Sequence, residues 1–264
     1  MKTKTAGVTL MLLACGAAHA AEGGDDADAL AKALANPVAA LISVPFQYNY
    51  DRTFGDKGYR HTLNVQPVVP ISLNEDWNII SRTIVPIIYQ NEVVPGTDQA
   101  GLGDVVQSIF ISPKEPTSSG LIWGIGPVFL LPTGTDDLSA DTWAAGPTAV
   151  ALLQHGSWTY GALVNHLADV GGARGRRTDV STTMLQPFVT RGLSGGRTIA
   201  VNLESTYDWK ARQWLIPLNL QYSKVTRIGR QRVSFQGGVR AYLDGPRGGP
   251  DWGLRFNVTL LYPK

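Results

Sequence analysis

The stretch RTIAVNLESTYDWK, residues 197–210, decides the fold because polar and apolar residues alternate along it one by one. One series is Thr198, Ala200, Asn202, Glu204, Thr206 and Asp208, and the other is Ile199, Val201, Leu203, Ser205, Tyr207 and Trp209. A period of two predicts a strand with one polar face and one apolar face. The run is also longer than most strands of soluble proteins. The pattern therefore leaves two readings, a soluble sheet with its apolar face inward or a membrane sheet with its apolar face in lipid.

The composition of the whole chain favours the membrane reading. Charged residues make up 17% of the 264 residues, where soluble proteins have about a quarter. The mean hydropathy of −0.03 is too low for a bundle of membrane helices but fits a barrel, in which polar and apolar residues alternate and cancel. The net charge is only +2, and no segment concentrates Lys and Arg, so we expect no nucleic-acid partner.

The N-terminus, MKTKTAGVTLMLLACGAAHAAEGG, has the features of an export signal. Lys2 and Lys4 form a basic region, residues 8–14 form an apolar region, and residues 18–20 (AHA) form a small-x-small cleavage site. We expect a signal peptide over residues 1–20. After this segment there is no run of about 18 apolar residues, so the sequence predicts no membrane-spanning helix.

An alternative reading of the same segment is a lipobox at Leu12-Leu13-Ala14-Cys15, which would attach lipid to Cys15. Cleavage after the AHA site would instead remove the single cysteine of the chain and leave no possibility of a disulfide.

Residues 21–39 are expected to form a periplasmic N-terminal segment ahead of a barrel over residues 40–264. Asp26 or Asp28 can cap a short helix over 29–35, which Asn36-Pro37 ends. This helix either caps the periplasmic mouth or packs Leu30 and Leu34 inside the barrel. Both placements stay open.

From residue 40 onward the chain consists of runs of about ten to fourteen residues bounded by Gly, Pro, Asp or Asn. The expected strands are 41–51, 61–73, 77–90, 105–113, 121–132, 144–154, 157–169, 180–191, 197–209, 213–223, 230–243 and 252–262. About twelve strands of this length suit a tilted crossing of the hydrocarbon layer. The expected fold is an all-β, antiparallel transmembrane barrel with a short N-terminal helix.

The connections between these strands support a barrel. Mostly the odd-numbered ones are longer and more charged, as in RTFGDKGYR and NEVVPGTDQAGLGD, and the even-numbered ones are shorter, as in NED and HG; KAR, the ninth, is an exception. Outer-membrane barrels have long outer loops and short periplasmic turns. A soluble sandwich does not favour one end in this way.

Aromatic residues lie near the expected strand ends, where membrane interfaces favour them. The members are Trp77, Tyr89, Trp209, Trp214, Tyr222, Trp252 and Tyr262. The apolar face of 197–210 is therefore expected to meet lipid and its polar face a wet lumen. Two strands, 121–132 and 144–154, are apolar on both faces; either the N-terminal helix covers them inside or they line an apolar patch.

Several segments resemble one bacterial family, the "MetA-pathway of phenol degradation" outer-membrane proteins. They are ALANPVAALISVPFQYNYD (33–51) with TLNVQPVVPISL after it, GLGDVVQSIFISPK (101–114), GPVFLLPTGTDD (126–137), WAAGPTAVAL (143–152), WTYGALVNHL (158–167) and the terminal RFNVTLLYPK. The resemblance implies a transporter-like outer-membrane barrel, and it carries no functional residues over to this chain.

Catalytic and metal sites have weak signals. Beyond the signal segment the histidines are His61, His155 and His166. Only His155 has a Ser two positions away, Ser157, and this pair flanks Gly156 in an expected turn rather than sharing a strand face. We therefore expect that this chain is not an enzyme and binds no cofactor. The aspartates of TGTDDLSADT (133–142) match no calcium-loop spacing, so a solvated loop is expected there.

Loop GGARGRR (171–177) offers Arg174, Arg176 and Arg177, which can bind lipopolysaccharide phosphates or simply remain solvated. GLGD (101–104) is read as a tight turn, because neither a Lys-Ser/Thr pair nor a helix follows it. The expected partners are outer-membrane lipids, lipopolysaccharide and a small solute.

The predicted lumen carries the candidate site. Residues expected to line it are Arg82, Arg232, Arg240, Arg255, Glu204, Asn165, Asn202, Asn219 and Asn257, together with Asp208, Asn49 and Gln66. Arg232, Arg240 and Arg255 lie on consecutive strands and share one wall, which would favour anions. The sequence therefore predicts a channel for a small aromatic or anionic solute. The alternative is a non-conducting barrel, structural or ligand-binding, in which these arginines and Glu204 form ion pairs that fill the interior.

Overall fold

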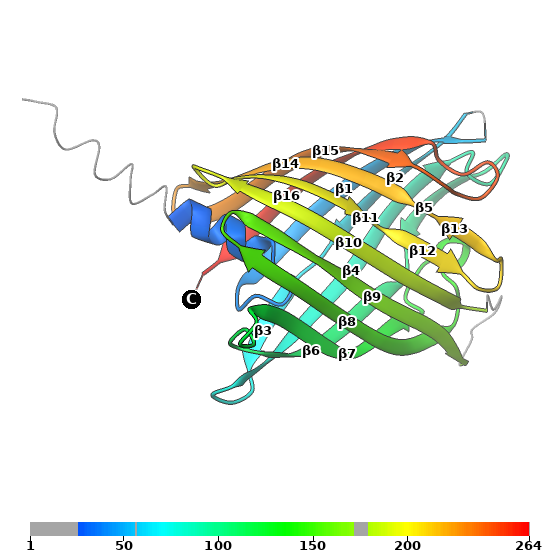
Figure 1. Ribbon diagram of the computed structural model, residues 1–264. Helices are drawn as coiled ribbons and strands as arrows, with labels where there is room; N and C mark the ends of the chain where they lie inside the picture. Colours follow the sequence, from blue (N-terminus) through cyan, green and yellow to red (C-terminus); the bar gives the residue numbers. More distant parts are fainter. Residues whose placement is uncertain (1–25, 56, 172–178, 264) are drawn as a thin grey trace, which may run out of the picture.

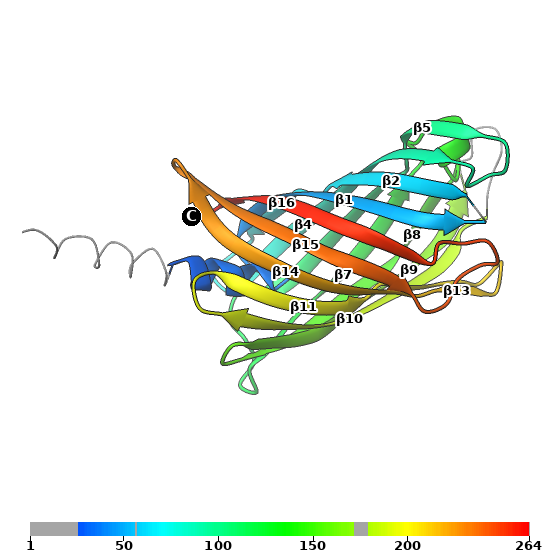
Figure 2. The same ribbon diagram turned by 90° about the horizontal axis from the view of Figure 1, so that it is seen from above.

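The chain folds into an antiparallel β-barrel in the computed structural model, which describes residues 26–55, 57–171 and 179–263. β1 pairs with β16 from Ile42↔Tyr262 to Arg52↔Trp252, and this pairing joins the first strand to the last and closes the barrel. The strands are tilted steeply, and both a short helix and the C-terminus lie at one end, called here the helix end (Figure 1). The view from above shows the opposite, far end, where β5 and β13 lie (Figure 2).

Sixteen ladder segments make up the sheet. They are β1 (Ile42–Phe54), β2 (Gly58–Val65), β3 (Val68–Ser72), β4 (Trp77–Asn91), β5 (Asp98–Leu102), β6 (Val105–Pro113), β7 (Leu121–Leu131), β8 (Trp143–His155), β9 (Trp158–Gly171), β10 (Ser181–Leu193), β11 (Arg197–Leu203), β12 (Ser205–Asp208), β13 (Gln213–Leu215), β14 (Pro217–Ile228), β15 (Gln231–Tyr242) and β16 (Trp252–Tyr262). A 3₁₀ turn, η1, spans Asp136–Leu138, and residues 26–34 form the N-terminal helix.

These segments form twelve barrel strands, which confirms the expected fold class. Four strands are interrupted once, and prolines explain two of the interruptions. Glu204, between β11 and β12, lies opposite Pro217, and Pro67 separates β2 from β3. Proline has no N–H to donate to the ladder, so the pairing breaks locally while the strand continues.

The expected strand ends were wrong at the far end. RTFGDKGYR was read as a long loop, but β1 continues to Phe54 and β2 begins at Gly58. Thr53 has φ 72° and Gly55 has φ 57°, a left-handed pair that turns the chain tightly. The loop NEVVPGTDQAGLGD likewise contains β5, paired with β4. The strands therefore extend beyond the runs that hydrophobic alternation marked.

The outer surface of the barrel is apolar. In the stretch 197–210, the side chains of Ile199 and Trp209 are 41% and 55% exposed, whereas Thr198 is 9% exposed. Six of the seven expected strand-end aromatics are exposed, namely Tyr89, Trp209, Trp214, Tyr222, Trp252 and Tyr262. An apolar exterior over a polar interior suits lipid outside, as in membrane barrels. No helix in the described ranges has the length and apolar character needed to cross a membrane.

The interior has two unlike walls. Apolar side chains predominate on the inward faces of β4 and β6–β9, called here the apolar wall, and polar side chains predominate on β10, β11, β14–β16 and β1, called here the polar wall. The apolar wall includes Ile80, Phe110, Val128, Val150, Leu152 and Leu163. Val38, after the helix, packs against this wall, so β7 and β8 are covered on the inside by Val38 and neighbouring strands rather than by the helix itself.

Candidate functional site

An ion-paired cluster bridges the polar wall of the lumen. The Arg255 guanidinium donates to both carboxylate oxygens of Glu204, at 2.6 Å from Nη1 and 2.8 Å from Nη2. Its Nε donates to Asn49 Oδ1 at 2.7 Å. Glu204 follows β11 and Arg255 lies on β16, so the pair reaches across the two strands between them, β14 and β15. Two parallel charge-assisted hydrogen bonds of this kind hold both side chains in one orientation.

A second arginine joins this cluster from β15. Arg240 Nη1 lies 3.4 Å from Asp51 Oδ1, and its Nη2 lies 3.8 Å from Glu204 Oε2. The Tyr242 hydroxyl donates to Asp51 Oδ1 at 2.8 Å. Asp51 and Arg240 are both buried. Asp51, Glu204, Arg240 and Arg255 are called here the charge cluster.

Glycine makes room for the charge cluster at one position. Gly253 lies between Asp51 and Arg240 in the register of β1, β16 and β15. A Cβ atom there would lie 2.5 Å from Asp51 Oδ1 and 2.5 Å from the Tyr50 carbonyl oxygen. Any larger residue would displace the carboxylate that Arg240 contacts.

Two further arginines stand in the lumen without a carboxylate at ion-pair distance among the described residues. Arg60 Nε donates to Gln90 Oε1 at 2.7 Å, and its guanidinium lies over the Phe54 ring, 5.0 Å from the centroid. Arg82 Nη2 donates to Gln66 Oε1 at 3.1 Å. With Arg240 and Arg255, these make four cations against two carboxylates, so the described lumen is positive in this region.

A cavity of about 280 Å³ lies between the helix and the polar wall, and is called here the helix-end cavity. Amide and hydroxyl side chains dominate its lining on the polar wall, whereas Val68, Leu163 and Phe188 bring apolar surface. The polar residues are Ser43, Gln66, Gln186, Thr190, Thr198, Asn202, Gln221, Ser223, Ser234, Gln236, Asn257 and Thr259. Arg82 is the one charged residue among the described lining residues.

The N-terminal helix lies at the helix end of the barrel (Figure 1), and its residues Ala31 and Leu34 line this cavity. Residues Leu30 and Ala31 of the helix pack with Leu41, Val225 and Leu261, so of the two open placements, the one that sets Leu30 against strands 121–132 and 144–154 is not what the structure shows. Polar contacts fasten the helix as well: the Asp26 carboxylate pairs with Arg232, the Gly196 N–H donates to Asp28, and Gln154 Nε2 donates to the Lys32 carbonyl at 3.0 Å.

Arg232 therefore lies apart from the charge cluster. It shares β15 with Arg240, but its described ion pair is with the helix. The grouping of Arg232 with Arg240, Arg255 and Glu204 in one set of ion pairs is not what the structure shows.

The predicted asparagines lie at different places along the lumen. Asn219 is fully buried and donates to Asn202 Oδ1 at 2.8 Å. Asn202 lies two positions before Glu204 in the sequence. Asn257 donates to Gln236 Oε1 at 3.5 Å in the lining of the helix-end cavity. Asn165 is opposite Thr148 and Met184 in the register of β8–β10.

Sequence reasoning missed Asp51, Arg60 and Tyr242 as lumen residues. All three continue an alternating series toward the far end: Asp51 follows Asn49 by two positions, and Tyr242 follows Arg240 by two. The signal was the period of two: Asp51 and Tyr242 lie within the expected strands 41–51 and 230–243, and only Arg60 lies in a segment expected to be a loop.

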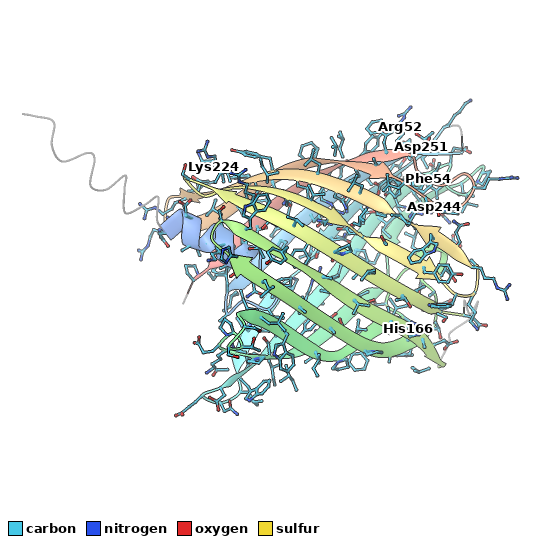
Figure 3. The ribbon with its side chains drawn as sticks, viewed as in Figure 1. Arg52, Phe54, His166, Lys224, Asp244 and Asp251 are labelled. Carbon is cyan, nitrogen blue, oxygen red and sulfur yellow. The ribbon has the colours of Figure 1, made fainter. Side chains whose placement is uncertain are left out.

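The histidines lie outside the lumen cluster. His61 Nδ1 is 2.5 Å from the Tyr48 hydroxyl, within a group of contacting aromatic rings that includes Tyr50, Tyr59 and Tyr89. His166, labelled in Figure 3, has Nδ1 2.9 Å from Thr183 Oγ1. His155 ends β8 and is exposed. Among the described residues, no group of three or more His, Cys, Asp or Glu is arranged to hold a metal.

The loops at the far end are held by local polar contacts. The Asp104 carboxylate accepts hydrogen bonds from Gly134 N at 3.0 Å, Ser139 Oγ at 2.7 Å and Ala140 N at 2.7 Å, which holds the loop around η1 against the start of β6. Asp244 and Asp251 lie at this end, and Lys224 lies at the opposite one (Figure 3). The arginines of GGARGRR, and the expected signal peptide, lie outside the described residues.

Comparison with known proteins places the fold among outer-membrane barrels. No protein-family model matches the chain, and no curated protein matches it in sequence. The resemblance to the MetA-pathway proteins therefore stays a prediction.

Solved structures do match. The COG4313 outer membrane channel from Pseudomonas putida F1 aligns over 84% of this chain and 96% of its own, with a TM-score of 0.67 and 13% identity. The β domain of the Bordetella autotransporter BrkA aligns over 84% and 99%, with a TM-score of 0.50 and 9% identity. Outer membrane phospholipase A from Escherichia coli aligns over 87% and 97%, with a TM-score of 0.48 and 11% identity. At such identities the likeness is one of fold: the chain has the fold of an outer-membrane β-barrel.

Proposed function

We propose that this protein is a channel in the outer membrane, exported by a cleaved signal peptide, surrounded by lipid and lipopolysaccharide, and used for passive passage of a small solute, aromatic or anionic. The observation that carries the proposal is the polar, positive lumen. A barrel stabilised only by apolar packing would not need an interior lined by amides, hydroxyls and arginines. Such a lining suits a hydrated path. The likeness of fold to a protein described as an outer membrane channel agrees with this reading.

The path proposed has two narrow points. The N-terminal helix narrows the helix end, and the charge cluster narrows the lumen beyond the cavity. A rearrangement of the Arg240 and Glu204 side chains would widen the lumen there. Because arginines outnumber carboxylates there, anions would pass more easily than cations.

One observation favours a second candidate, a non-conducting barrel that binds a ligand or supports the membrane. Arg255 is only 3% exposed and its ion pair with Glu204 spans two strands, which would obstruct flow if the pair never opens. The proposed absence of catalysis is common to both candidates.

Single-channel conductance of the refolded protein in planar bilayers tests the proposal. The full chain is compared with Asp26→Asn/Asp28→Asn, which removes the helix contacts to Arg232 and Gly196. We expect discrete steps with anion preference, and larger or more frequent steps in the variant. The matched control is Glu75→Gln/Asp76→Asn, which removes the same charge from an exposed turn at the same end and is expected to behave as the unmodified chain. Silence from all three barrels, each shown to be folded by heat-modifiable migration, would refute the channel and favour the non-conducting candidate.

A further inference from the structure

Arg82 is a cation without a matching anion in the described lumen. Among the described residues its guanidinium donates to Gln66, and no described carboxylate lies within 4 Å of it; Glu204 acts on it only at longer range. A guanidinium carries five N–H donors. Arg82 lines the helix-end cavity, and its hydrogen bond to Gln66 uses one of these donors.

A second group in the same cavity is also unpartnered. Gln221 is 5% exposed, and its Nε2 atom is buried without an acceptor among the described residues. Buried donors are normally hydrogen-bonded, so an acceptor group on a bound solute would satisfy this one. Arg82 and Gln221 approach the cavity from different strands, β4 and β14.

The remaining surface of the cavity is suited to an apolar body. Phe188 of β10, Leu163 of β9 and Val68 of β3 line it, with Leu34 from the helix. A volume of about 280 Å³ is at the lower limit for small-molecule sites. A ligand that satisfies both surfaces has one acceptor-rich anionic group and a compact apolar remainder.

We propose that the helix-end cavity binds a small monocarboxylate with an apolar body, its carboxylate on Arg82 and its body against Phe188 and Leu163. The planar guanidinium fits a carboxylate with two parallel hydrogen bonds. A dianion would leave its second charge unmatched, because Arg82 is the sole charged group in the described lining. A cation would face Arg82 directly and be repelled.

This inference deepens the proposed channel function by naming a solute class, and it is tested without any flux. Equilibrium binding to the full-length protein, refolded in detergent, is measured by calorimetry with three probes: benzoate, its neutral counterpart benzamide, and acetate, which lacks the body. We expect benzoate to bind about tenfold or more tightly than either of the others, since a hydrogen bond to a charged group and apolar burial each contribute on that scale.

Variants then locate the site. Arg82→Gln is expected to weaken benzoate binding about tenfold or more and to leave benzamide unchanged. Arg230→Gln, in the exposed turn before β15, is the matched control and is expected to bind benzoate as the unmodified chain does. Equal binding of benzoate and benzamide would overturn the inference even if Arg82→Gln failed to fold, and so would unchanged benzoate affinity in a folded Arg82→Gln. Conductance steps without benzoate binding would overturn this inference alone and leave the channel standing.

Discussion

Replacing Glu204 by Gln removes the carboxylate on which the charge cluster depends. Arg255 loses an anionic partner that accepts at 2.6 and 2.8 Å, and Arg240 loses a carboxylate oxygen at 3.8 Å. Arg255 is 3% exposed, so water cannot replace the carboxylate. Removing one partner of a buried pair costs about 3–5 kcal/mol. The Gln oxygen and Asn49 retain some hydrogen bonding to Arg255, so we expect a loss of about 3 kcal/mol in the free energy of unfolding.

Urea unfolding in lipid vesicles, followed by tryptophan fluorescence, measures this loss. Glu75→Gln, in an exposed turn, serves as the control and should leave the free energy of unfolding unchanged within about 0.5 kcal/mol. Arg255→Gln and the double variant complete a cycle whose coupling between Glu204 and Arg255 should exceed about 1 kcal/mol. A coupling near zero, or an unchanged unfolding free energy for Glu204→Gln, would show that the pair does not hold the lumen together. In bilayers the same variant should conduct with stronger anion preference, because the lumen gains one net positive charge.

Three further changes test other parts of the barrel. Asp104→Ala should cost about 2–4 kcal/mol, because three donors from the loop around η1 lose their acceptor, and limited proteolysis should then cleave that loop faster. Phe256→Arg places a charge on the lipid face of β16 and should lower the free energy of unfolding in vesicles by about 2–4 kcal/mol. Asn257→Arg, at the next residue, which faces the cavity, should lower it much less. Equal losses would contradict the assignment of faces. Arg232→Gln should detach the helix by removing its pair with Asp26, and a spin label on Lys32 should report the increased mobility.

Alternation predicted the strands well because the two faces of each strand meet different solvents. In 252–262 the polar series Arg255, Asn257 and Thr259 alternates with apolar residues, and the lumen and lipid sides follow from that order. Strands β7 and β8 were also expected, but alternation does not distinguish their faces, because their inner faces are apolar and pack with Val38 and residues of β4, β6 and β9. A period of two arises where the two faces of a strand contact different surroundings. A strand whose two faces both contact apolar surroundings shows no such alternation.

The ion-pair and hydrogen-bond partners of the lumen side chains could not be predicted from the sequence, for a geometric reason. Strand register and period place Arg255, Arg240 and Glu204 on the inner face, but they do not say which inward side chains touch. Glu204 and Arg255 are separated by two strands, and only the curvature of a closed barrel brings their side chains together. Curvature depends on the number of strands and their stagger, which are properties of the whole closed sheet. The unpaired state of Arg82 follows from the same curvature, because the carboxylate that acts on it at longer range is already held by Arg255. The closure of the barrel thus separates the arginines into two groups: Arg240 and Arg255 lie within reach of Asp51 and Glu204 and are ion-paired, whereas Arg82, in the lining of the helix-end cavity, has no described carboxylate at ion-pair distance.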